Sequence, residues 1–128
     1  MGSLILDASV LIGLLDAADA HHRTSVDDVA AADQAGTVLL TPASAYSEAL
    51  VAFARAGRVS AARDAVAGMG ISVTPLTADI AERAADLRAR HEALRLPDAV
   101  VLATSLHLGA ELLTYDARLT RIAADHRG

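Results

Sequence analysis

The sequence predicts an α/β protein in which helices cover both faces of a central parallel sheet. Two observations predict this class. Short apolar segments typical of buried strands alternate with longer segments of helical periodicity. The hydrophobic fraction is 53%, yet the chain has one Phe, two Tyr and no Trp, which indicates closely packed, alanine-rich helices. At 128 residues the chain is long enough to bury one core, so we expect one domain over residues 1–128.

The first half of the chain predicts two strands separated and followed by helices. In order they are a strand at 4–6, a helix from 9 to 15, a helix within 19–35, a strand at 37–40, a helix from about 42 to 56 and a helix at 60–67. Thr41 and Pro42 predict the start of the third helix, because threonine is a good cap and proline fits the first helical position. Gly36 and Gly57 are expected to end two of these helices.

The second half predicts two more strands and three helices. In order they are a strand at 71–74, a helix from 77 to about 94, a helix from 97 to 109, a strand at 111–114 and a helix at 117–124. Thr77 is the expected cap of the first of these helices, and Pro97 opens the second. Strands that alternate with helices favour parallel pairing, and right-handed crossovers leave few topologies.

Two aspartates follow strands of this predicted sheet. Asp7 interrupts the apolar run LILDASVLI directly after the first strand, and Asp116 lies two residues after the fourth. A buried carboxylate without a partner is costly, so Asp7 must be reached by water or by a positive group. Ligands of parallel sheets bind at the carboxyl ends of strands, where the strand order reverses. If the first and fourth strands are neighbours, both acids therefore face one crevice.

Each acid of interest also has a purely structural explanation. Asp7 and Asp116 are natural N-caps of the helices that follow them. Asp98, next to Pro97, lies in a first helical turn, where the helix dipole favours a negative charge. Glu48 is compatible with a solvent-facing helix position. Its neighbours on the helix are Ala45 and Ala52, and the core face is predicted at Tyr46, Leu50 and Phe53.

The order of the four acids along the chain is more informative than any one of them. An Asp follows the first strand, a Glu lies in the segment PASAYSEAL, and two Asp lie in LPDAVVLATSLHLGAELLTYD. In this order and spacing, over essentially the whole chain, the sequence resembles the PIN-domain nucleases, most closely the VapC-type toxins of bacterial toxin–antitoxin pairs. The resemblance implies a three-layer α/β/α domain with a parallel sheet of four strands. It leaves a fifth strand open, because many members carry one after the last helix.

The resemblance also implies which residues act. The metal-binding and catalytic set would be Asp7, Glu48, Asp98 and Asp116. Ser9 would orient the first of these acids or a metal-bound water, and Thr114 would support the last. Carboxylate oxygens select Mg²⁺ or Mn²⁺, and the chain has no cysteine and only scattered histidines. Such ions activate water and stabilise the leaving oxygen of a phosphodiester.

The charge balance bears on how such a protein binds RNA. The net charge is −5, and all eleven basic residues are arginine. An acidic chain is a poor non-specific binder of nucleic acid, whereas arginine suits forked contacts with phosphate. Arg95 and Arg118 each lie within three residues of a proposed metal ligand. We therefore expect these two side chains to bind phosphates beside the cleaved bond.

The resemblance further implies an endoribonuclease that is the toxin of a type II pair. Its partners would be an RNA substrate, a VapB-like antitoxin and a second copy of the chain. The helix pair over 42–67, with Tyr46 and Phe53, would help to form the antitoxin groove. No long apolar segment and no cationic leader are present, so we expect no membrane span and a cytoplasmic location.

Other classes fit the sequence less well. A receiver domain needs a lysine, which this chain lacks, and a haloacid-dehalogenase-like phosphatase needs a second Asp where Ser9 stands. No glycine-rich phosphate loop follows the first strand. The alternative that stays open is a PIN-like module that binds RNA or an antitoxin without cleaving. Nothing in the sequence predicts which RNA is recognised.

Overall fold

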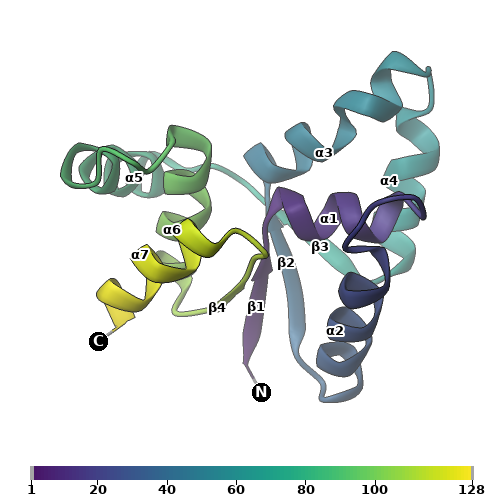
Figure 1. Cartoon of the computed structure of the whole chain (residues 1–128), viewed down its shortest axis with the longest axis horizontal. Coiled ribbons are helices and arrows are strands. Elements are labelled where there is room, and N and C mark those ends of the chain that lie inside the picture. The colour runs from purple at the N-terminus through teal and green to yellow at the C-terminus, as the bar shows by residue number, and fades with distance from the viewer. Residues whose placement is uncertain (1, 128) are drawn as a thin grey trace.

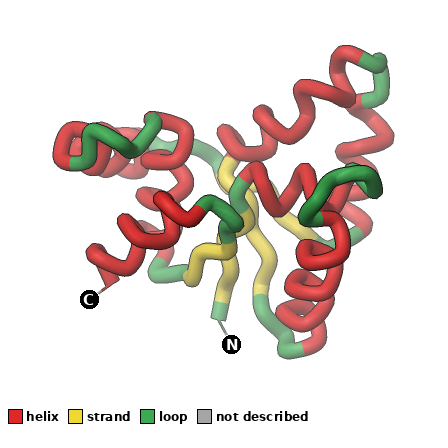
Figure 2. The backbone as a smooth tube through the Cα atoms, in the orientation of Figure 1, coloured by secondary structure: helices red, strands yellow, loops and turns green. Residues whose placement is uncertain are grey.

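The computed structural model describes residues 2–127, which form three layers, α/β/α (Figure 1). The elements are β1 (Ser3–Leu6), α1 (Ala8–Leu15), α2 (His22–Gln34), β2 (Val38–Pro42), α3 (Ala43–Arg55), α4 (Val59–Gly68), β3 (Ile71–Thr74), α5 (Ala78–Arg90), α6 (Leu96–Leu108), β4 (Glu111–Leu113) and α7 (Ala117–Arg127). Figure 2 shows the strands between two groups of helices. This confirms the predicted fold class, and within residues 2–127 the sheet has four strands and not five.

The four strands are parallel and lie in the order β3-β2-β1-β4. In the middle of β1, Ile5 pairs with Leu40 of β2 on one side and with Leu112 of β4 on the other. The first and last strands are therefore neighbours, which is the condition under which Asp7 and Asp116 face one crevice, and the strand order reverses between them. The residues that follow Leu6 and Leu113 consequently emerge at the same edge of the sheet.

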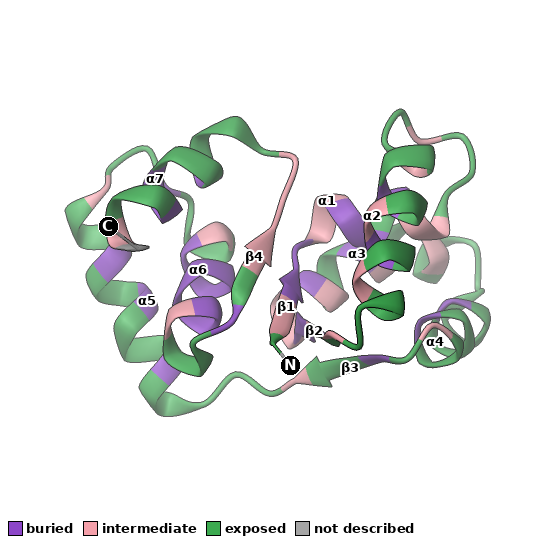
Figure 3. Cartoon of the chain, turned by 90° about the horizontal axis from the view of Figure 1, so that it is seen from below, coloured by how far each residue is buried: buried purple, intermediate pink, exposed green. Residues whose placement is uncertain are grey.

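Strand β1 supplies side chains to two separate hydrophobic cores. Ile5 and Leu6 are both completely buried, and they point to opposite faces of the sheet because side chains alternate along a strand. Ile5 packs with side chains of α5, α6 and α7, whereas Leu6 packs with α1, α2 and α4. Figure 3 shows buried positions on α1 and α6, on either side of the strands. Within residues 2–127 no helix combines the length and the apolar character needed to cross a bilayer.

Among the predicted boundaries that are wrong, two have a physical reason that the structure shows. Strand β2 continues through Thr41 and Pro42, so Thr41 does not cap a helix, and α3 begins at Ala43. The Thr41 hydroxyl is fully buried and donates a 2.8 Å hydrogen bond to the Leu6 carbonyl of the adjacent strand. Helix α5 ends at Arg90 and not near residue 94, because the backbone of the next residue is extended, with φ −124° and ψ 92°.

The predicted core face of α3 also needs correction. The residues that α3 buries are Ala45 and Ala49, whereas Tyr46, Leu50 and Phe53 are only partly buried. Alanine allows a helix to approach its neighbours closely, so the small side chains take the centre of the contact. The larger side chains then lie at its margins. Glu48 lies beside the buried alanines and is exposed. It lines a cavity whose other lining residues include residues of α1 and α6.

Helices α1 and α2 approach each other closely at Gly13. A Cβ atom there would lie 2.1 Å from Ser25 Oγ and 3.1 Å from the His21 carbonyl oxygen. The Ser25 hydroxyl is buried and donates to that same carbonyl at 2.7 Å, so it cannot turn away without losing its partner. We expect Gly13→Ala to lower the free energy of unfolding by about 1–3 kcal/mol, measured by urea denaturation.

The matched control for this prediction is Gly68→Ala. Gly68 is also helical, but no atom lies within 4 Å of a Cβ built on it. Alanine there should leave stability unchanged or raise it by up to about 1 kcal/mol, because it restricts the unfolded chain. Equal urea midpoints for the two variants would show that α1 and α2 are not in close contact at Gly13.

Candidate functional site

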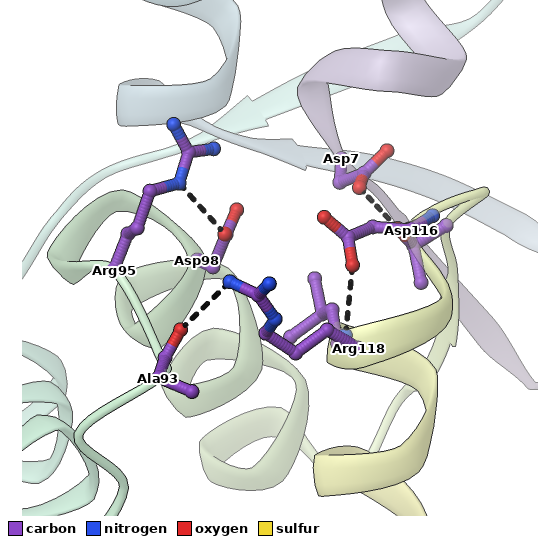
Figure 4. Close-up of polar contacts among 8 residues, drawn as sticks. Asp7, Ala93, Arg95, Asp98, Asp116 and Arg118 are labelled. Atoms are coloured by element: carbon purple, nitrogen blue, oxygen red, sulfur yellow. Dashed lines mark hydrogen bonds and ion pairs between the residues drawn. The ribbon is translucent and has the colours of Figure 1, made fainter.

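A cavity of about 210 Å³ opens where β1 and β4 end. Its lining includes all four acids that the sequence singled out, which come from separate segments of the fold. These are Asp7 after β1, Glu48 in α3, Asp98 in α6 and Asp116 after β4. Figure 4 shows three of them, Asp7, Asp98 and Asp116, around one space. The topology therefore brings together side chains from both ends and the middle of the chain.

Asp7 is the most deeply placed of the four acids, with 5% of its surface exposed. The Ser9 hydroxyl donates to Oδ1 at 2.6 Å, and the Val10 N–H donates to the same oxygen at 3.1 Å. The Thr114 hydroxyl donates to Oδ2. Asp7 is thus the N-cap of α1 and also a member of the cavity lining. These hydrogen bonds explain how a carboxylate is accommodated in an apolar run.

Thr114 joins the ends of the neighbouring strands β1 and β4. Its Oγ1 donates to Asp7 and accepts a hydrogen bond from the Asp116 N–H at 3.1 Å. Asp116 in turn accepts from the Leu119 N–H through Oδ1 at 3.0 Å, the contact expected of a helix cap. The structural explanations of Asp7 and Asp116 therefore hold alongside their position in the cavity. One hydroxyl fixes the two acids relative to each other.

Negative charge is crowded in this cavity. Partial burial raises the pKa of the Glu48 carboxyl, and the charges of Asp98 and Asp7 raise it further against the opposing effect of Arg95. Burial likewise raises the pKa of Asp98, with added repulsion from Asp116 and Asp7. The charge and hydrogen bond of Arg95 oppose this rise. Such mutual repulsion is relieved when a cation binds or a proton is taken up.

The two predicted arginines are placed differently. Arg95 lines the cavity, and its Nε lies 3.3 Å from Asp98 Oδ2, with 68% of the arginine side chain exposed. Arg118 donates from Nη1 to the Ala93 carbonyl at 3.3 Å and is not part of the described cavity lining (Figure 4). An exposed ion pair contributes little stability, so the Arg95 guanidinium can exchange Asp98 for another anion at small cost.

The lining of the cavity suits a hard divalent cation by the type of its donors. All four acids offer oxygen, which Mg²⁺ and Mn²⁺ prefer. The acids are spread around the cavity: within residues 2–127 no three Asp, Glu or His side chains converge closely enough to hold an ion directly. Mg²⁺ commonly keeps several waters and binds through one or two carboxylates, so a lining of this width fits it.

Tyr115 and His21 adjoin the site and were not predicted. The Tyr115 N–H donates to Ser9 Oγ at 3.3 Å, and its ring stacks on His21 with centroids 4.8 Å apart. Burial raises the pKa of the Tyr115 phenol to about 12. The one signal in the sequence is the place of this rare aromatic between Thr114 and Asp116. The stacking of Tyr115 on His21 joins residues far apart in the chain, so no local sequence pattern predicts it.

A second cavity, of about 350 Å³, adjoins the first between α1 and α3. The two share Ile12 and Glu48. The lining of the second is largely apolar and includes Phe53, whereas Tyr46 packs against the hydrophobic core of α1, α2 and α4. Of the two aromatic side chains expected to line a partner groove, one lies in this cavity.

Comparisons with known proteins bear on this arrangement. The family model of the PIN domain matches residues 4–125. Among solved structures, a chain of a toxin–antitoxin complex from Klebsiella pneumoniae is 25% identical, with a TM-score of 0.71 over 91% of this chain and 88% of that one. VapC20 of Mycobacterium tuberculosis, a toxin that cleaves the sarcin–ricin loop, is 23% identical, with a TM-score of 0.74 over 93% and 94%. No curated protein matched in sequence.

Proposed function

This chain belongs to the PIN-domain family, and we propose that it is a metal-dependent endoribonuclease, the toxin of a type II toxin–antitoxin pair. The observation that carries the proposal is the cavity lined by Asp7, Glu48, Asp98 and Asp116 where β1 and β4 end. The family match over almost the whole chain supports the nuclease activity. The likeness to a chain of a toxin–antitoxin complex supports the biological role.

In this proposal one or two of the four acids would bind Mg²⁺ or Mn²⁺ directly, and the others would bind it through waters that the ion keeps. When bound, the ion supplies an activated water and stabilises charge on the leaving oxygen of the phosphodiester. The chain's own residues prepare the site. Ser9 and Thr114 hold the Asp7 carboxylate in one orientation, and Thr114 also fixes the backbone of Asp116. A site whose side chains are already oriented avoids the cost of reorganisation during the reaction.

The second cavity supports the proposed antitoxin partner. An apolar space of this size beside the acids suits a segment of an antitoxin that covers the active site. A homodimer, in the cytoplasm, completes the proposal. Sedimentation of the purified chain as a monomer, without tendency to associate, would count against the dimer. The alternative is a PIN-like module that binds RNA or an antitoxin without cleaving, and the presence of all four acids disfavours it.

Incubation of the purified protein with end-labelled single-stranded RNA and Mn²⁺ tests the proposed function. We expect internal cuts that leave a 5′-phosphate on the downstream product. Sequencing the new RNA ends after induced expression would then identify the substrate. Binding of RNA without any cut, under all divalent cations tried, would favour the non-cleaving alternative.

The two arginines yield a graded prediction. We expect Arg95→Ala to weaken RNA binding about tenfold, because a charge-assisted hydrogen bond to phosphate contributes roughly 1.5–3 kcal/mol. Arg118→Ala should also weaken RNA binding, but by less, because the Arg118 guanidinium must give up its hydrogen bond to the Ala93 carbonyl before it can bind phosphate. The control is Arg88→Ala, an exposed change of the same charge on α5. Fluorescence anisotropy titrations measure all three.

Titrations with Mn²⁺ alone distinguish the two roles that these arginines can have. If they bind phosphate, Mn²⁺ affinity should change little in the variants. If they only neutralise nearby carboxylates, Mn²⁺ affinity changes and RNA affinity does not. Equal RNA affinities for Arg95→Ala, Arg118→Ala and Arg88→Ala would contradict the prediction.

A further inference from the structure

A stacked pair of rings lies beside the acid-lined cavity. The rings of His21 and Tyr115 have centroids 4.8 Å apart and planes inclined by 25°. Tyr115 stands between Thr114 and Asp116, and its N–H donates to Ser9 Oγ, the hydroxyl that donates to Asp7. The stack is therefore connected to the candidate metal site through the Tyr115 backbone and the Ser9 hydroxyl.

Both members of the pair are held in place. The Tyr115 phenol donates to Asp28 Oδ2 of α2 at 2.9 Å. The His21 N–H donates to Asp19 Oδ2 at 2.9 Å, and the His21 carbonyl accepts from the Ser25 N–H and hydroxyl at 2.8 and 2.7 Å. The backbone that carries the histidine ring is thus fixed on both sides of the residue. The ring then rests on a tyrosine that is itself anchored.

The outer face of the His21 ring is open. His21 is exposed, whereas Tyr115 beneath it is half-buried. The inner face of the histidine ring has a structural role, because it covers the tyrosine ring. This role does not explain why a flat polar ring is used, since a branched apolar side chain would cover the tyrosine as well. A flat, fixed ring with one open face is suited to stack on another flat group.

Nucleobases are such groups. Unpaired bases of single-stranded RNA stack on aromatic side chains, histidine included, and this contact tolerates any base. It also needs no positive charge, which matters for a chain of net charge −5 that has no lysine. With one Phe, two Tyr and no Trp in the chain, few aromatic rings are available for this purpose. One pair is placed next to the acids.

We propose that the open face of His21, supported from behind by Tyr115, binds a nucleobase of single-stranded RNA next to the phosphodiester that is cut. This inference rests on the proposed ribonuclease function and adds the side chain that holds the strand. Tyr115 is a positioning residue, since it acts through the histidine ring. A base held on this stack would place its neighbouring phosphate over the four acids.

The test compares His21→Leu with His21→Phe. Leucine keeps Tyr115 covered but has no flat face, whereas phenylalanine restores the face without the imidazole. Both are made in an Asp98→Asn background, so that the probe stays intact. The probes are labelled oligoadenylate and a ribose-phosphate oligomer of the same length without bases, and anisotropy with Mn²⁺ present gives the dissociation constants.

We expect His21→Leu to weaken oligoadenylate binding about 5- to 100-fold and His21→Phe to stay within about threefold of the parent. On the oligomer without bases, all three proteins should bind equally. In proteins that retain Asp98, the His21→Leu change should raise KM and leave kcat and Mn²⁺ affinity nearly unchanged.

Three results would overturn the base site. The first is that the parent and His21→Leu bind oligoadenylate with equal affinity. The second is that His21→Leu weakens binding of the oligomer without bases by the same factor. The third is a loss of Mn²⁺ affinity in His21→Leu, which would show that the ring only holds the loop that carries Asp116. If His21→Leu leaves KM unchanged while the wild type cleaves RNA, the base site alone fails. A wild type that neither binds nor cleaves RNA removes the proposed function itself.

Discussion

Replacing Asp98 by asparagine is expected to reduce RNA cleavage by at least about a thousandfold while the protein stays folded. A metal ion stabilises transition-state charge by several kcal/mol, and each 1.36 kcal/mol corresponds to about tenfold in rate. Among the described residues, the hydrogen bond of the Asp98 side chain is to Arg95, a largely exposed partner. The amide therefore leaves no buried group unpaired. Initial rates on labelled RNA with saturating Mn²⁺ measure the effect.

Asp86→Asn is the matched control for this variant. Asp86 is exposed on α5 and pairs with Arg90 at 3.2 Å, so the substitution makes the same change of charge beside an arginine. It should cleave at the wild-type rate. Because burial and the neighbouring carboxylates raise the pKa of Asp98, its neutral replacement should keep or raise the melting temperature of the metal-free protein. Wild-type turnover in Asp98→Asn would leave Asp98 as a first-turn helix residue only.

Removal of divalent cations is expected to abolish cleavage completely. Excess chelator should stop the reaction, and added Mn²⁺ should restore it, because in the proposed mechanism the bound ion supplies the activated water. Mn²⁺ should also raise the melting temperature of the wild type, since a ligand at 100 times its dissociation constant stabilises the native state by about 2.7 kcal/mol. Calorimetry in chelator and in Mn²⁺, for the wild type and for Asp98→Asn, measures both effects. The variant should gain much less stability from the ion.

The pH dependence of the metal-free protein offers a check on the same site. The pKa values of Glu48 and Asp98 are raised in the folded state, so at intermediate pH the native protein binds more protons than the unfolded chain. Its stability should therefore fall as the pH rises from the ordinary carboxyl pKa through the raised values. Mn²⁺ should remove this trend.

Cleavage that continues undiminished in chelator would contradict the metal mechanism altogether.

Much of the fold follows from local patterns in the sequence. Thr77 was expected to cap a helix, and its Oγ1 accepts from the Ile80 N–H at 3.3 Å. Gly109 was expected to end α6, and it has the left-handed backbone, φ 63°, that glycine adopts at little cost. The sequence left open whether β1 and β4 are neighbours, and their pairing in the structure meets the condition under which Asp7 and Asp116 face one crevice.

The remaining features depend on contacts between distant segments. Thr41 before Pro42 has the pattern of a helix start. In the structure, however, the Thr41 hydroxyl donates a hydrogen bond to the Leu6 carbonyl of the adjacent strand, and Thr41 is part of β2. The buried face of α3 depended on how closely its neighbours pack, which favours alanine over the aromatic residues. The stacking of His21 on Tyr115 joins a loop and a strand end that no local pattern connects. Sequence periodicity does not report such contacts.

The hydrogen bond between Thr114 and Asp7 spans 107 positions of the chain, and this sets an order of events during synthesis. The chain leaves the ribosome with its N-terminus first, and contacts of large sequence separation form late. Strands β1, β2 and β3 can pair once residue 74 has emerged, whereas Asp98 and Asp116 have not yet left the ribosome at that point. On the proposed function, the growing polypeptide therefore has no nuclease centre while it is being translated. Activity begins only after β4 has docked.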